Sequence, residues 1–125
     1  MDVLCEPADI DELLLRLRNN ARLQFVRRPC DPSKDPINEM GRMGMLRGEA
    51  EIMIHGLQKN EFVAETECDD RRLRCTKMWV FKHHYAPKDG RGPYEIYIKL
   101  GSVVDDGLPE KEAIIVIVIS FHEDV

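Results

Sequence analysis

The sequence has no apolar run long enough to cross a lipid bilayer. The longest, from Ala113 to Ile119, has seven residues, whereas a membrane-spanning helix needs about 20. The first residues are acidic and lack the basic, then apolar, layout of a signal peptide, so we expect a soluble cytoplasmic protein without membrane contact. There is also no low-complexity run or internal repeat. A length of 125 residues, 43% of them hydrophobic, predicts a single domain spanning residues 1–125.

Common nucleotide-binding and hydrolase motifs are missing as well. There is no glycine-rich phosphate loop, no Gly-x-Ser-x-Gly elbow and no His-Glu-x-x-His helix. Without a secretion signal, the four cysteines are expected to be reduced thiols. A zinc site built from Cys68, Cys75, His83 and His84 is an alternative, but the gap between the two cysteines is wider than in usual zinc knuckles. We therefore expect neither metal nor cofactor.

A net charge of −5 argues against a protein that coats nucleic acid non-specifically. The charges are unevenly distributed, however. Every charged residue from Arg16 to Arg28 is positive, and only Asp89 and Glu95 oppose the eight cations between Arg71 and Lys99. A basic face can therefore coexist with an acidic whole, although charge alone favours an ordinary mixed surface.

The first half of the chain has helical periodicity. Asp9 begins a helix as its cap, with apolar residues at helical spacing up to Asn19. A short strand over 22–28 follows, then a proline-rich loop over 29–36. A helical turn over 39–43 and a second helix over 49–57 complete this half, with the methionines as core residues.

The second half is typical of β-structure. Strands are predicted over 62–68, 74–84, 94–99 and 113–121, with turns over 85–90 and 105–109. The last strand is apolar on both faces, so we expect a central strand covered by helices on at least one side. Together these elements predict an α+β domain with helices on one face of a mainly antiparallel sheet.

Four residues on the predicted strands have the chemistry for metal-free RNA cleavage. Lys82 lies near the end of one strand, Tyr97 and Lys99 share a face of the next, and His122 follows the last. RNA cleavage needs a base for the 2′-hydroxyl, an acid for the leaving 5′ oxygen and cations for the phosphorane. His, Tyr and Lys supply these functions, although each residue alone is more often an ordinary surface side chain.

Short motifs in the second half resemble the MqsR branch of the RelE-like toxins. Looser matches upstream extend the resemblance from about Asp9 to Glu123. The matching pieces are Gly56-Leu57 with Phe62 five residues on, Trp79 to Lys82, Tyr85-x-Pro87, Tyr97-Ile98-Lys99-Leu100 and Val118-Ile119-Ser120-Phe121.

The resemblance implies a RelE-like fold and a growth-inhibiting mRNA interferase that cuts single-stranded mRNA. It also implies a cognate antitoxin as partner, with DNA contacted only through that antitoxin. Tyr97 matches the family's catalytic tyrosine, and Lys82 and His122 fall on further active-site positions. The resemblance also places Lys99 on the family's motif lysine. We expect RNA phosphates to be bound by Lys99, Arg91, His83 and His84.

Two departures keep a second hypothesis open. Ala64 stands where the family has a lysine, and the chain is acidic for a protein that grips RNA. The alternative is a weakened or inactive member of the fold that acts through protein–protein interaction.

Overall fold

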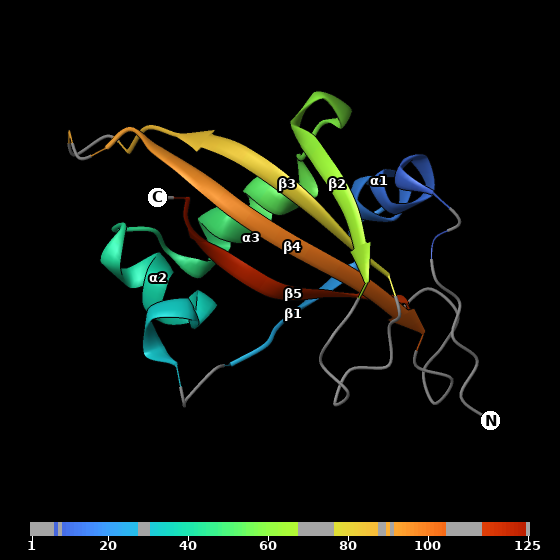
Figure 1. Cartoon of the computed structure of the whole chain (residues 1–125), viewed down its shortest axis with the longest axis horizontal. Helices are drawn as coiled ribbons and strands as arrows, with labels where there is room; N and C mark the ends of the chain where they lie inside the picture. The colour runs from blue at the N-terminus through green and yellow to red at the C-terminus, as the bar shows by residue number, and fades with distance from the viewer. Residues whose placement is uncertain are drawn as a thin grey trace.

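The computed structural model describes residues 7, 9–27, 31–67, 77–87, 90, 92–104 and 114–124. Within these residues, three α-helices, two short 3₁₀ helices and five strands form an α+β fold (Figure 1). The elements are α1 (Ile10–Arg18), β1 (Arg22–Phe25), η1 (Pro32–Lys34), α2 (Pro36–Arg42), α3 (Arg47–His55), η2 (Lys59–Glu61), β2 (Phe62–Glu67), β3 (Lys77–Tyr85), β4 (Tyr94–Val104) and β5 (Ile114–Glu123).

The five strands form one mixed sheet in the order β1-β5-β4-β3-β2. β2, β3, β4 and β5 pair antiparallel in succession, and β1 pairs parallel with β5. The prediction of a mainly antiparallel sheet is thus confirmed. β5, expected at the centre, is an interior strand between β1 and β4, while β4 occupies the middle. The predicted turn over 105–109 lies outside the described residues.

Local capping fixes the first helix as the sequence predicted. The Asp9 carboxylate accepts a hydrogen bond from the Glu12 amide at 3.0 Å, which satisfies one free amide at the helix start. The helix ends at Asn19, and Asn20 follows with a φ of 57°. Asparagine tolerates this left-handed conformation better than most residues, so the chain turns here into β1.

The proline-rich segment is more ordered than the predicted loop. Pro32 and Pro36 each stand in the first turn of a helix, where a missing N–H costs nothing. The buried Asp35 carboxylate caps α2 by accepting a hydrogen bond from the Asn38 amide at 3.2 Å. As a result α2 begins three residues before the expected turn at Glu39.

The main core lies between the helices and one face of the sheet. Trp79, Phe81, Ile98 and Phe121 are fully buried against residues of α1, α2 and α3, as the helix periodicity predicted. Figure 1 shows α1 and α3 behind the sheet, with α2 beside β5. The buried methionines of this core are Met40, Met43 and Met45.

The opposite face of the sheet is apolar at one end and polar at the other. One end carries a small apolar cluster that includes Met78, Val103 and Ile117. The other end carries polar residues of β3, β4 and β5. No helix within the described part of the chain is both long enough and apolar enough to span a bilayer.

Candidate active site

Strand register brings Lys82, Tyr97 and His122 into one row. Lys82 on β3 lies directly opposite Tyr97 on β4, and Tyr97 lies directly opposite His122 on β5. Directly opposed residues project from the same face of a sheet. The row therefore crosses three strands on the face away from the helices, and we name these three residues the cross-strand row.

A β-bulge in β5 directs His122 to this face. The β4–β5 register pairs Lys99 with Ser120 but Leu100 with Val118, so β5 has one extra residue at Ile119. Side chains alternate with a period of two, and one added residue reverses the faces of all that follow. Val118 and Phe121 consequently both face the helical core, and His122 faces the opposite side.

The sequence had placed His122 just beyond a strand ending at Phe121. Instead β5 continues to Glu123, so His122 is held by strand pairing. Regular alternation from Val118 would have put His122 on the helix face. Because the strand is apolar on both faces, its sequence gives no sign of the bulge.

Tyr97 and His122 are in ring contact. Their ring centroids are 5.1 Å apart and their planes differ by 17°, a stacked arrangement. The Nδ1 atom of His122 lies 3.0 Å from the Glu123 carbonyl oxygen. A carbonyl can only accept a hydrogen bond, so Nδ1 carries the proton, and Nε2 of the neutral ring carries the lone pair. This tautomer suits Nε2 to act as a base.

Lys82 is paired with a carboxylate that follows β5. Its Nζ lies 2.9 Å from Oδ2 of Asp124. The hydrogen bond to Asp124, and then the charge of that carboxylate, raise the pKa of Lys82 above its ordinary value. Lys82 is therefore an ammonium group at neutral pH. It can stabilise negative charge or donate a proton, but it cannot serve as the base.

The neighbouring row contains Lys99. Lys99 lies opposite Val80 on β3 and Ser120 on β5, and it shares its face with Tyr97 two residues away. Ala64 on β2 lies opposite Val80, so it belongs to the same row. The lysine expected at position 64 from the MqsR resemblance would thus have projected from this face.

The two adjacent histidines of β3 project from opposite faces. His84 is exposed, shares the face of Lys82 and lies opposite Glu95. His83 lies on the helix face, and its Nδ1 is hydrogen-bonded to the Glu61 carboxylate. The structure therefore does not bring His83 together with Lys99 and His84, because successive strand residues alternate between faces. The expected phosphate ligand Arg91 lies outside the described residues.

The same alternation bears on the zinc alternative. A tetrahedral site would need His83 and His84 to converge on one point, but they project from opposite faces of β3. His83 is also hydrogen-bonded to Glu61 of η2. The remaining proposed ligands, Cys68 and Cys75, lie outside the described residues. The geometry of the histidines therefore does not support this ligand set.

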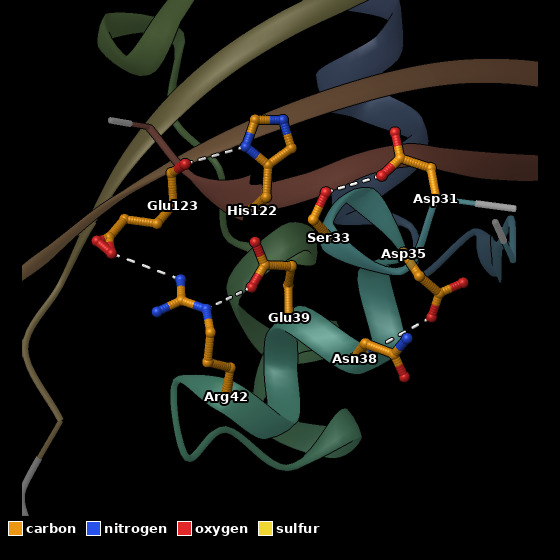
Figure 2. Close-up of polar contacts among 8 residues, drawn as sticks. All are labelled: Asp31, Ser33, Asp35, Asn38, Glu39, Arg42, His122 and Glu123. Atoms are coloured by element: carbon orange, nitrogen blue, oxygen red, sulfur yellow. Dashed lines mark hydrogen bonds and ion pairs between the residues drawn. The ribbon is translucent and has the colours of Figure 1, made fainter. Parts of the chain in front are cut away.

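Charged residues that sequence reasoning missed connect β5 to α2 (Figure 2). Arg42 Nε lies 2.6 Å from Glu39 Oε2, and Arg42 Nη2 lies 3.5 Å from Glu123 Oε1. The hydrogen bond to Glu39 and the charges of both carboxylates raise the pKa of Arg42. Glu39 and Arg42 have the i,i+3 spacing of a helical ion pair, but no sequence signal links them to Glu123.

The row combines a candidate base, a phenol and a fixed cation on one surface. These are the functional groups that general acid–base cleavage of a phosphodiester requires. No protein-family model, curated protein sequence or solved structure matches the chain. The chemical interpretation of the site therefore depends on the positions of its own side chains.

Proposed function

We propose that this chain is an mRNA interferase toxin with a RelE-like fold, similar to the MqsR branch. It would cleave single-stranded mRNA in the cytoplasm without a metal ion, and a cognate antitoxin would neutralise it. The alignment of Lys82, Tyr97 and His122 across β3, β4 and β5 carries the proposal. In this proposal His122, Tyr97 and Lys82, which come from three neighbouring strands, would act as base, acid and cation on one phosphodiester.

In the proposed reaction, His122 Nε2 removes the proton from the 2′-hydroxyl. The 2′ oxygen attacks the adjacent phosphorus, and the bond from phosphorus to the 5′ oxygen breaks. The Tyr97 hydroxyl gives its proton to that leaving oxygen. The products are a 2′,3′-cyclic phosphate and a free 5′-hydroxyl. The Nδ1 contact of His122 with the Glu123 carbonyl supports this assignment, because a neutral ring that donates from Nδ1 has its lone pair on Nε2.

The two lysines of this face would provide the positive charge. Lys82, kept protonated by Asp124, would stabilise the phosphorane directly beside Tyr97. Lys99, one row away, would bind the neighbouring phosphate. Strand pairing holds the backbones of both lysines in place, so little backbone motion would be needed when RNA binds.

A second candidate function is an inactive or weakened member of the fold that acts on a protein partner. Two observations favour it. Ala64 provides no cation in the row of Lys99, and the ammonium of Lys82 is already matched by Asp124. Both features lower the positive charge that is available to bind RNA phosphates. That charge is the main source of affinity for nucleic acid.

Expression of the chain without its proposed antitoxin separates the two candidates. The nuclease predicts growth arrest that Tyr97→Phe and His122→Ala both relieve, since each removes one proton-transfer group. Tyr94→Phe is the matched control because Tyr94 packs against the helix-side core; it should stay toxic. All variants must show wild-type circular dichroism. Arrest that survives in both site variants would reject the catalytic assignment.

A further inference from the structure

Asp124 forms an ion pair with the ammonium group of Lys82. Its carboxylate lies 2.9 Å from Lys82 Nζ, with both side chains only partly exposed. The Asp124 amide donates a 2.7 Å hydrogen bond to the Glu95 carbonyl of β4. This backbone bond anchors the residue beside the end of the cross-strand row. The backbone therefore holds Asp124 close to Lys82 at this end of the sheet.

A carboxylate and a phosphate compete for an ammonium group by the same chemistry. Both present anionic oxygens that accept charge-assisted hydrogen bonds from Nζ. Lys82 lies directly opposite Tyr97, so a phosphate attacked beside Tyr97 and His122 would approach the same Nζ. The phosphate must then displace Asp124 or share the lysine with it.

We infer that Asp124 is a specificity-determining residue that competes with the RNA phosphate for Lys82. The inference rests on the proposed function, in which Lys82 binds that phosphate. Asp124 holds Lys82 protonated and oriented in the free protein. It also raises the threshold for binding, so that an RNA must supply further contacts, such as stacking on Tyr97 or a phosphate on Lys99, to displace it.

The test measures affinity for a single-stranded 2′-O-methyl oligoribonucleotide, which cannot be cleaved because its nucleophile is blocked. Asp124→Asn retains the backbone bond and the side-chain size but removes the charge. We expect it to tighten binding about two- to fivefold at low salt, the range of an exposed ion pair. In a Lys82→Met background the same change should have no effect, because the contested cation is gone.

The matched control is Glu95→Gln, which removes one negative charge from the same face, a charge that acts on Lys82 through space and not through the side-chain hydrogen bond that Asp124 makes. It should tighten binding less than Asp124→Asn does. The inference is overturned if Asp124→Asn leaves affinity unchanged or weakens it. It is also overturned if the gain persists in Lys82→Met, which would mean a general charge effect.

These outcomes are distinguishable from failure of the proposed function. Cleavage of the unmodified oligoribonucleotide is measured in parallel with the same variants. Tighter binding through Lys82 without any cleavage would support the role of Asp124 while rejecting the nuclease. Cleavage with no Lys82-dependent effect of Asp124→Asn would do the reverse.

Discussion

Tyr97 and His122 stack across the β4–β5 pair with their ring centroids 5.1 Å apart. Each ring limits the rotation of the other, and strand pairing fixes both backbones. If the pair acts in catalysis as proposed, two side chains held in this way lose little further freedom when substrate binds. Removal of either ring should therefore affect both the chemistry and the orientation of the remaining partner.

We expect Tyr97→Phe and Tyr97→Ala to differ in a single-turnover cleavage assay. Phenylalanine keeps the stack and loses only the proton donor, so the rate should fall about 10²- to 10⁴-fold. Alanine also frees the His122 ring, so the rate should fall further. Equal rates for the two variants would show that the stack does not position His122.

The adjacent histidines of β3 provide a matched pair of variants. His84→Ala removes a side chain from the face of the cross-strand row, and we expect it to weaken binding of single-stranded RNA about two- to fivefold. His83→Ala alters the opposite face and should leave RNA affinity unchanged. Its contact with Glu61 instead predicts a small loss of stability in urea unfolding. A larger binding defect in His83→Ala would place the RNA on the helix side.

The raised pKa of Lys82 should depend mainly on its hydrogen bond to Asp124. Because the folded-state pKa is raised, the stabilisation from this pair is present below the ordinary lysine pKa and is lost as the pH rises through the folded value. Titration of the lysine side chains by NMR should therefore show Lys82 above its ordinary pKa of 10.5. Asp124→Asn should lower it, whereas a value unchanged by that substitution would contradict the pairing.

Asp35 is expected to be a key residue for the stability of α2. Its buried carboxylate caps the helix and accepts hydrogen bonds from Arg27 Nε at 3.0 and 3.1 Å. Asp35→Ala should lower the free energy of unfolding by about 1 to 3 kcal/mol, since it loses the cap and a buried hydrogen bond. Asp35→Asn, which keeps a capping oxygen, should cost less in the same urea titration. Equal losses would mean that the cap contributes little.

Arg42 couples α2 to the strand that bears His122. Arg42→Ala should cost about 0.5 to 1 kcal/mol of stability, because half of the side chain is exposed and solvent weakens its ion pairs. Lys34→Ala is the control, since Lys34 pairs only within its own helical turn at 3.9 Å. It should leave stability nearly unchanged. Equal costs would show that the link between α2 and β5 is not stabilising.

Local signals in the sequence predicted much of the fold. The Asp9 cap and the apolar spacing of Leu13 and Leu17 located α1, because helix capping and periodicity act within a few residues. The strand predicted over 74–84 located β3, whose Trp79 and Phe81 both lie in the core. The prolines misled because Pro36 was read as a loop residue, whereas it opens α2.

The arrangement of the site depended on information that a sequence pattern does not contain. The bulge at Ile119 decides which face His122 occupies, yet it is set by pairing with β4 across the sheet. Likewise, Asp124 and Glu123 gain their partners only because β5 ends close to Lys82, one strand beyond β4, and close to Arg42 of α2. Long-range register and packing fix these contacts, which a local sequence pattern does not contain.

Cleavage of a defined single-stranded RNA in excess chelator tests the central claim most directly. We predict that the wild-type protein cuts this RNA and leaves a 2′,3′-cyclic phosphate, and that His122→Ala is slower by about 10²- to 10⁴-fold. Cutting that stops in chelator and returns with added metal, or a His122→Ala variant as fast as wild type, would contradict it.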